Sequence, residues 1–409
     1  MLSSSEPGNI NSEIQKEEIE NHHCWNLETI PTELFLLICS FLDAKFVIRT
    51  LSQVNKRFYD IIKEYTTWKF RITKRWPKKY PIVSVPDELF DWKKACVQRE
   101  EQYKLWSQWE TRMSYFCISR AHYAAVDVVH FLEGSHLFVS GSRDRSLKLW
   151  DISKFDSTQA SSDFRSCLSE IRIDAHQGWI WSLASAGHQF YSGGWDANIK
   201  CWDMKANFSN VKIVNWNSAI LCLDYFGNLL TAGTYGKQVL LFDPRTKLDS
   251  VMYHANHKRA VLCIAMDDNF IITGSEDQSL IIFDKRNRKL LNVIKFQGYP
   301  MSLSYGYDHL WVGDKQGVIH LIDPTNEKFN LVETYKIGHV GKITGISHSL
   351  GSVITCSTDK TISILEPNAD PEVITKLSLA GEIAGIANVG QMLVSANSDC
   401  SIGVWLSKI

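Results

Sequence analysis

Three residue types in the middle of this 409-residue chain could form a hydrolase triad. His176, Ser192 and Asp196 would act as general base, nucleophile and orienting carboxylate. The same types recur earlier in the same order, at His122, Ser140 and Asp144. Because a repeated nucleophile is implausible, we expect both sets to form buried hydrogen-bond networks with Trp150 and Trp202. The chain also lacks the GxxxxGK[ST], GxSxG and HExxH motifs, so we expect no catalytic residue.

A metal site is the next chemistry to consider. His22, His23 and Cys24 are adjacent, but a structural zinc site needs four convergent ligands and no fourth lies nearby. The ten cysteines include no CxxC pair, and several fall in strand-like runs where a small apolar residue fits. We therefore expect no metal, no cofactor and a reducing compartment.

The overall charge limits the partners. The chain has 44 basic and 45 acidic residues, a net charge of -1, so neither nucleic acid nor an anionic membrane is an expected partner. The N-terminus lacks the apolar core of a signal peptide, and no apolar run is long enough for a membrane helix. We expect a soluble intracellular protein, cytoplasmic with a nuclear share left open.

The elements that would position these residues come from a repeat. Residues 176–204 contain three aromatic and β-branched runs separated by turn residues, which predicts three antiparallel strands. A large apolar residue marks each copy at intervals of 39 to 52 residues: Trp150, Trp202, Phe242, Phe283, Ile322, Leu365 and Trp405. Asp follows this marker in five copies, Glu366 in the sixth and Leu406 in the seventh. The sequence thus contains seven copies of one unit.

The unit resembles the WD repeat, whose period is about 40 to 45 residues. This resemblance implies a mainly β fold with a seven-bladed propeller at 114–409. The last copy lacks a fourth strand, and the strand-like run Tyr115–Ser119 stands just before the first copy. A ring of blades must close to bury its faces, so we expect this run to complete the last blade.

The N-terminal part has a different composition. Residues 1–24 are rich in Ser, Asn, Glu and Gln, which predicts a disordered tail. Pro31 then precedes an apolar stripe at helical spacing, Asp43 can cap a second helix, and Lys56–Tyr65 predicts a third. Three short helices make a core too small to be stable alone, so we expect a partner to cover its surplus apolar surface.

This region resembles an F-box, the helical motif that docks on the Skp adaptor of cullin-based ubiquitin ligases. The resemblance rests on the spacing from IPTEL to LSQVNKRF and on Trp68. It implies a small all-α F-box at 25–70 and an adaptor-binding set: Ile30, Pro31, Leu34, Ile38, Leu42, Val54 and Phe58. Pro31, Leu34 and Ile38 should touch the adaptor, with Leu42, Val54 and Phe58 holding the bundle behind them.

A helical linker is expected at 71–113. Its basic first part, KRWPKKYP, could serve as a nuclear address, but we interpret it as a solvated turn. From Pro86 to Trp109, apolar residues at helical intervals predict packing on the propeller or the bundle, with Leu89, Trp92 and Trp106 among them.

Another Asp, the turn Asp, lies six residues before the marker in five copies: Asp144, Asp196, Asp277, Asp359 and Asp399. One rim of a WD propeller is built from the residue before each turn Asp and from residues that open the innermost strand. A receptor for phosphorylated peptides would want several arginines there. The expected rim instead gathers aromatic residues beside one Arg, a composition typical of binding hot spots. The substrate-binding prediction is Arg143, Trp179, Trp181, Trp195 and Tyr235. Trp181 could equally be core or rim.

The chain as a whole therefore resembles F-box proteins with WD repeats. This implies a non-catalytic substrate receptor of a Skp-cullin-F-box ligase, which binds the Skp adaptor and, through it, cullin and the RING subunit, and promotes ubiquitination of an unknown protein substrate. Covalent transfer would belong to other subunits, and this chain would supply proximity. A non-proteolytic scaffold that assembles proteins is the alternative.

Overall fold

The computed structural model describes residues 27, 29–83, 85–132, 136–154, 164–245, 251–253, 257–307 and 309–408. The expected disordered tail, with His22, His23 and Cys24, lies outside these residues. The chain divides into two compact units between Lys74 and Arg75.

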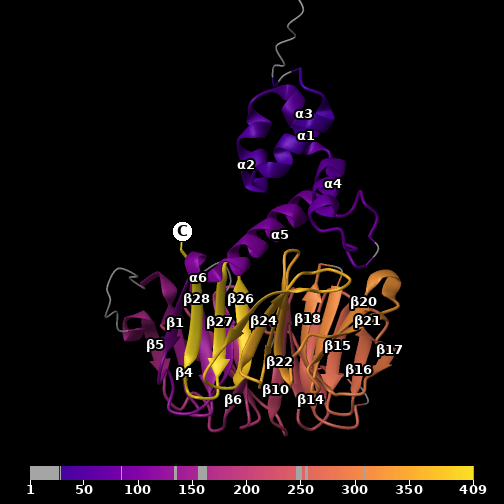
Figure 1. Ribbon diagram of the computed structural model, residues 1–409. Helices are drawn as coiled ribbons and strands as arrows, with labels where there is room; N and C mark the ends of the chain where they lie inside the picture. Colours follow the sequence, from indigo (N-terminus) through magenta and orange to yellow (C-terminus); the bar gives the residue numbers. More distant parts are fainter. Residues whose placement is uncertain are drawn as a thin grey trace, which may run out of the picture. The chain divides into compact units, whose positions relative to one another are not determined.

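The first unit is helical (Figure 1). Its elements follow the pattern of Pro31, apolar stripe and capping residues: α1 (Thr32–Phe41), α2 (Ala44–Arg49), η1 (Leu51–Gln53), α3 (Lys56–Lys63) and α4 (Tyr65–Arg75). The Asp43 carboxylate accepts a hydrogen bond from the Lys45 amide at 2.9 Å, and Asn55 caps α3 by accepting from the Phe58 amide at 2.8 Å. These side chains satisfy helix N–H groups that would otherwise lack partners.

The core of the helical unit is small and aromatic. Phe35 stacks on Phe58 with ring centroids 4.3 Å apart, and Cys39, Val47 and Ile62 are buried with them. Two residues of α4 complete the unit, although the predicted third helix was expected to run to Tyr65 without a break. The Trp68 indole donates to the Ile62 carbonyl at 2.8 Å, and the Arg71 guanidinium donates to the Cys39 and Leu42 carbonyls at the end of α1.

The second unit contains a propeller of seven four-stranded antiparallel sheets, which confirms the predicted fold (Figure 1). Blade 1 consists of β2 (Val126–Phe131), β3 (Leu137–Ser142), β4 (Leu147–Asp151) and β5 (Leu168–Arg172). Blade 2 consists of β6 (Ile180–Ala186), β7 (Gln189–Gly194), β8 (Asn198–Asp203) and β9 (Ser209–Asn215). Blade 3 consists of β10 (Ile220–Phe226), β11 (Leu229–Thr234), β12 (Val239–Phe242) and β13 (Val251–Tyr253). Blades 4 and 5 consist of β14 (Val261–Met266), β15 (Phe270–Ser275), β16 (Ser279–Asp284) and β17 (Lys289–Lys295), and of β18 (Pro300–Gly306), β19 (His309–Asp314), β20 (Val318–Asp323) and β21 (Asn330–Lys336). Blade 6 consists of β22 (Ile343–His348), β23 (Val353–Ser357), β24 (Thr361–Leu365) and β25 (Val373–Ser378).

The seventh blade joins the two ends of the propeller, as predicted. It combines β26 (Ile383–Val389), β27 (Met392–Asn397) and β28 (Ile402–Ser407) with β1 (Met113–Ile118) as the fourth strand. Tyr115 pairs with Trp405 across this junction, and their rings lie 4.7 Å apart. The ring is therefore closed by hydrogen bonds between strands about 290 residues apart in sequence, a separation that makes closure a non-local step.

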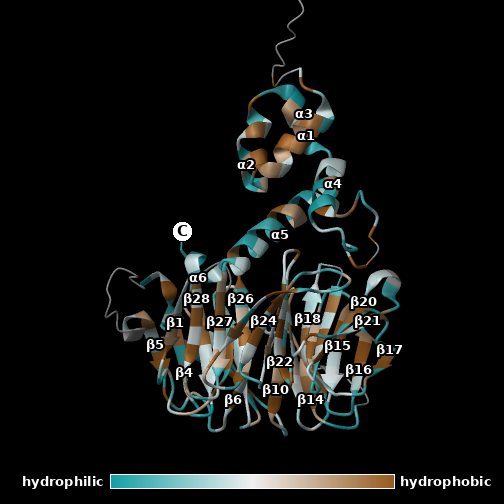
Figure 2. Ribbon diagram, in the orientation of Figure 1, coloured by the Kyte–Doolittle hydropathy of each residue, from teal (hydrophilic) through white to brown (hydrophobic). Residues whose placement is uncertain are grey.

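Hydrophobic packing continues between neighbouring blades. The hydrophobic colour in Figure 2 follows the blade strands, and much of the connecting chain at the rims is hydrophilic. Apolar clusters extend from each blade to the next because a single four-stranded sheet cannot bury both of its faces. The cysteines expected in blade strands, Cys201, Cys222, Cys263 and Cys356, are free and buried.

The segment before the propeller is an integral part of the second unit. Helices α5 (Trp92–Ser107) and α6 (Trp109–Arg112) lead into β1, and Leu105 and Trp106 share a core cluster with Ile364 and Trp405. The expected packing of aromatic residues on the propeller is confirmed for Trp106. Leu89 was expected to pack too, but it is exposed because it lies in the turn before α5.

A buried arginine fixes this segment to blade 6. The Arg99 guanidinium lies between the rings of Trp76 and Tyr80, at 4.4 and 4.6 Å, and donates to Glu366 at 3.4 Å and to Asn368. Glu366 is the residue that replaces the repeat Asp in this blade. The prediction of a solvated turn at KRWPKKYP was wrong, because Trp76 is buried by this contact and Lys78 pairs with acidic side chains of the same blade.

Candidate functional site

The residues with triad chemistry form networks inside the blades. In blade 2 the His176 Nδ1 lies 2.9 Å from Asp196, its Nε2 lies 2.6 Å from the Ser192 hydroxyl, and the Trp202 indole donates to that hydroxyl at 2.8 Å. His176 and Ser192 have no exposed surface. A nucleophile so placed cannot reach a substrate, and its oxygen is already held by an indole N–H.

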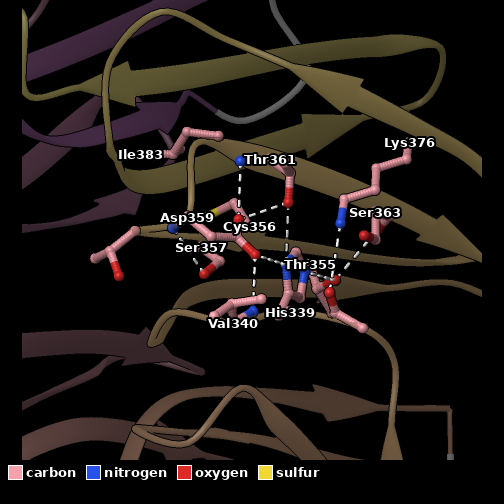
Figure 3. A network of polar contacts seen from close by, with 12 residues as sticks. His339, Val340, Thr355, Cys356, Ser357, Asp359, Thr361, Ser363, Lys376 and Ile383 are labelled. Carbon is pink, nitrogen blue, oxygen red and sulfur yellow. Dashed lines mark hydrogen bonds and ion pairs between the residues drawn. The ribbon is translucent and has the colours of Figure 1, made fainter.

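Equivalent networks occur in blades 1, 4 and 6. His122 bonds Asp144 and Ser140 in blade 1, and Figure 3 shows the blade 6 network, in which His339 bonds Asp359 and Thr355, both at 3.0 Å. Burial lowers the pKa of His122 and His339. Burial acts to raise the pKa of Asp359, but hydrogen bonds from Thr361 and His339 outweigh it and lower that pKa to about 2. Each His–Asp pair thus consists of a neutral imidazole and a carboxylate. It links the turn that carries the Asp to the strands of the same blade.

The predicted substrate-binding residues lie together on one rim of the propeller. Trp179 is 6.5 Å from Trp181 and 6.1 Å from Trp195, measured between ring centroids, and Trp195 is 5.7 Å from Tyr235. Trp179 and Trp195 are each about two-fifths exposed, at 43% and 40%, and Tyr235 is 58% exposed. We call Trp179, Trp195 and Tyr235 the aromatic shelf.

Backbone contacts hold the shelf in position. The Trp195 amide donates to the Trp179 carbonyl at 2.9 Å, and the Tyr235 amide makes the equivalent bond to Ala219. Gly178 is required beside Trp179, because a Cβ there would stand 2.7 Å from the Asp196 amide nitrogen. The turn that carries Trp195 and the loop that carries Trp179 can therefore meet closely.

Arg143 is a structural neighbour of the shelf. Its guanidinium lies 4.9 Å from the Trp179 ring and 5.7 Å from the Trp181 ring, and it makes hydrogen bonds of 3.0 to 3.2 Å to the Asp127 carboxylate. Burial raises the pKa of Asp127, and the Arg143 contact opposes that rise. The Arg143 charge is thus largely compensated within the protein, which reduces its value as an anchor for an incoming anion.

A cavity of about 550 Å³ opens beside the shelf and is lined by the innermost strands of all seven blades. Every one of these strands carries a β-bulge at the same place, for example between Val126 and Val128 in β2 and between Ile180 and Ser182 in β6. A bulge leaves one residue unpaired and redirects its side chain. The seven bulge residues all line the cavity: Asp127, Trp181, Leu221, Leu262, Met301, Thr344 and Ala384.

Trp181 belongs both to the hydrophobic core and to the rim of the propeller. Its ring packs on a small apolar cluster of Ala219, Leu221 and Ala260, and it also contacts the rings of Trp179 and Trp195 in the shelf. The sequence left these two placements open because the bulge that decides them is not visible in the residue pattern.

The helical unit presents an apolar face of its own. Leu34, Ile38 and Val54 are exposed, at 46%, 39% and 60%, whereas Ile30, Pro31 and Leu42 are half-buried. Val54 was expected to hold the bundle from behind, and this was wrong because the turn after η1 turns it outward. Phe58 is buried against Phe35, so it supports the face and cannot touch a partner directly.

Phe41 was missing from the predicted set. It is 82% exposed at the end of α1, and Leu37 beside it is also exposed. Figure 2 colours α1 as hydrophobic along most of its length. A helix with apolar residues on every side has more apolar surface than one small core can bury, and this signal was available in the sequence.

Among the residues that the structure describes, no group of three or more His, Cys, Asp or Glu side chains could hold a metal ion. No helix in the described part of the chain is long and apolar enough to cross a membrane.

Comparison with known proteins agrees with both units. Residues 27–73 match the F-box-like family, and residues 115–151, 165–203 and 249–284 match the WD domain, G-beta repeat family. The chain is 36% identical over 379 residues to human F-box/WD repeat-containing protein 9, covering 93% of this chain and 82% of the relative. It is 29% identical to the Caenorhabditis elegans F-box/WD repeat-containing protein mec-15, covering 83% and 86%.

The WD40 β-propeller domain of Doa1 has the same fold, with a TM-score of 0.60 over 72% of this chain and 97% of that chain at 17% identity. A closed WD-repeat propeller and an F-box-like helical unit in one chain define a class of two-part binding proteins. Proteins of this class are generally non-catalytic adaptors, and their F-box points to a Skp-type adaptor as partner. The chain belongs to the F-box/WD-repeat family.

Proposed function

We propose that this protein is the substrate-recognition subunit of a Skp-cullin-F-box ubiquitin ligase. The helical unit would bind the Skp adaptor and, through it, cullin and the RING subunit, and the propeller would bind the protein to be ubiquitinated. One observation carries the proposal: two separate apolar surfaces, on an F-box-like unit and on a WD propeller, are left exposed in a single chain of this family.

The proposed binding surface for the adaptor is the exposed apolar face of the helical unit. Leu34, Ile38 and Val54 supply exposed apolar surface, and we add Phe41 as the most exposed residue of α1. Ile30, Pro31 and Leu42 border this face and Phe58 supports it. Burying such side chains on a partner is worth about 25 cal/mol per Å² of apolar area removed from water.

The proposed binding surface for the protein to be ubiquitinated, the client, is the aromatic shelf. Rigid aromatic side chains that are partly exposed and held by a scaffold are typical hot spots, because they bury much area at low entropic cost. Trp179, Trp195 and Tyr235 would contact the client, and Trp181 and Arg143 would hold the shelf from below. The propeller would act by proximity, since it brings the client to the transfer machinery.

The adaptor contact can be tested by co-purification. Pro31→Ala combined with Leu34→Ala should abolish recovery of the Skp adaptor and cullin, because it removes surface from the proposed face. Phe70→Ala is the control, since Phe70 is a 52% exposed aromatic residue of α4, whereas Leu34, Ile38 and Phe41 belong to α1. Undiminished adaptor recovery with the double variant would contradict the docking surface. Recovery of neither adaptor nor cullin with the unaltered chain would favour a non-proteolytic scaffold.

The client contact needs a separate experiment. Affinity purification with the proteasome blocked should recover client proteins with the unaltered chain and lose them with Trp195→Ala combined with Tyr235→Ala, while the adaptor is retained. Leu290→Ala combined with Val293→Ala on β17 is the control, because it removes comparable exposed apolar surface from an outer strand. Equal client recovery from the shelf variant would eliminate this site.

A further inference from the structure

The mouth of the propeller cavity is divided into two chemically different arcs. Four consecutive bulge residues, on blades 2 to 5, are apolar: Trp181, Leu221, Leu262 and Met301. The bulge residues of blades 6, 7 and 1 are Thr344, Ala384 and Asp127. The ring is thus asymmetric although all seven blades share one register.

The apolar arc is continuous with the aromatic shelf. Trp181 packs on Ala219, Leu221 and Ala260 below and meets the rings of Trp179 and Trp195 above, at 6.5 and 5.9 Å. An apolar side chain of a bound segment could therefore contact the shelf and the arc at once. Such a two-sided contact favours one large ring or aliphatic chain over several small residues.

The charged residues of the same rim are unevenly paired. Arg143 is engaged by Asp127 at 3.0 Å, and Arg259 lies 3.5 Å from Glu276. Lys258, Lys315 and Lys342 form no ion pair with any acidic residue that the structure describes, and the acidic residues that line the cavity itself are Asp127 and Glu382. These exposed lysines lie in consecutive blades, at the openings of blades 4 and 6 and in the turn of blade 5.

Contacts with neighbouring residues fix where Lys315 and Lys342 lie at this rim. Lys342 lines the cavity, and its amide is held by the Thr358 hydroxyl at 3.0 Å. The Lys315 ammonium lies 5.0 Å from the Tyr299 ring, and its backbone amide donates to the Tyr299 carbonyl at 3.0 Å. Lysine ammonium groups that form no ion pair with a described residue therefore border the apolar arc.

We propose that the propeller recognises an acidic protein segment that carries a large aromatic or aliphatic side chain. The apolar side chain lies on the aromatic shelf and the apolar arc, and a carboxylate of the same segment faces Lys315 and Lys342. This inference rests on the proposed function for the identity of the segment as a client, but the recognition chemistry is independent of it.

The structure favours a carboxylate over a phosphate. A phosphate is best held by several arginines through paired N–H donors, and Arg143, Arg145 and Arg259 of this rim each already contact an acidic side chain. Lysine acts as a point charge and makes fewer geometric demands, which suits carboxylates spaced variably along a flexible segment.

The test uses the full chain, immobilised, to select from random 12-residue peptides displayed on phage. We expect enriched peptides to contain Trp, Phe or Leu together with Asp or Glu. A synthetic copy of the most enriched peptide is then measured by fluorescence anisotropy. Lys315→Gln combined with Lys342→Gln should weaken binding about tenfold and reduce its salt dependence.

The shelf variant Trp195→Ala with Tyr235→Ala should weaken binding of the same peptide about a hundredfold, because truncated hot spots dominate the binding energy. Lys289→Gln with Lys336→Gln, exposed lysines of β17 and β21, is the matched control and should bind like the unaltered chain. Circular dichroism establishes that each variant is folded.

Three outcomes would overturn the inference: no enrichment of acidic residues, unchanged binding by the Lys315 and Lys342 variant, or tighter binding when Asp and Glu are replaced by phosphoserine. The ligase proposal is judged separately by adaptor recovery. If acidic apolar peptides are selected but no adaptor is recovered, the recognition chemistry stands and the ligase proposal fails. If the adaptor is recovered but no such peptides are selected, the ligase proposal stands and the recognition chemistry fails.

Discussion

Replacing Ser192 by Ala is the most informative perturbation of the blade networks. An ionised carboxylate only accepts hydrogen bonds, so the His176 Nδ1 carries the proton that faces Asp196. The Ser192 hydroxyl therefore donates to the His176 Nε2 at 2.6 Å and accepts from the Trp202 indole at 2.8 Å. His176, Ser192 and Trp202 are buried, so no water replaces a partner that either the imidazole or the indole loses.

The expected loss of stability follows from the number of buried polar groups that lose their hydrogen-bond partner. Ser192→Ala leaves two buried polar groups unpaired, and each costs about 1–3 kcal/mol, so we expect a loss of about 2–6 kcal/mol in the free energy of unfolding. Blade 4 provides the matched comparison. There Thr273 holds His257 at 2.9 Å, and the marker is Phe283, which has no N–H, so Thr273→Val should cost only about 1–3 kcal/mol.

Urea denaturation followed by intrinsic fluorescence measures both values. Adding Trp202→Phe to Ser192→Ala should recover part of the loss, because it removes the indole N–H that had been left without a partner and reproduces the blade 4 pairing. Equal losses for Ser192→Ala and Thr273→Val, or a double variant that is simply additive, would refute the reasoning. A hydrolytic activity lost with Ser192→Ala at unchanged stability would refute the structural role of the network.

Three further predictions concern stability. Deleting Ser114–Arg120 removes β1 from the closing blade, so the melting temperature should fall sharply, and an unchanged melting curve would contradict the closure. Arg99→Met leaves the Glu366 carboxylate buried without its cation and should cost about 3–5 kcal/mol in urea denaturation; a neutral result would remove the role of this contact. Burial lowers the pKa of His130 and His348 to about 4, below the unfolded value near 6.5, so the unfolded state binds protons first as the pH falls. Stability should therefore be full above pH ~6.5 and should drop by up to about 1.4 kcal/mol per pH unit per histidine towards pH ~4, and the variant His130→Gln with His348→Gln should flatten this dependence.

Much of the fold could be predicted because it depends on local spacing. The apolar marker and the turn Asp recur at intervals that a repeated three-stranded unit satisfies, and the incomplete last copy required a strand from before the first. The shelf residues could be grouped for the same reason. Equivalent positions in adjacent blades must lie side by side once all blades share one register.

The partners of individual side chains could not be predicted. Arg143 was predicted to bind substrate, yet it pairs with Asp127, and this pairing depends on the bulge that redirects Asp127 to the cavity. Likewise, Glu366 appeared in the sequence only as a departure from the repeat, and its contact with Arg99 joins residues 267 positions apart. Neither pairing leaves a periodic trace in the residue pattern.

The sequence by itself thus determined the number of blades, the way the ring closes, the internal His networks and the presence of an F-box with excess apolar surface. Tertiary structure alone decided which apolar residues stay outside, such as Phe41 and Val54, and which are covered, such as Phe58. The physical reason is that backbone periodicity is set by neighbours along the chain, whereas burial and charge pairing are set by whatever the closed fold brings into contact.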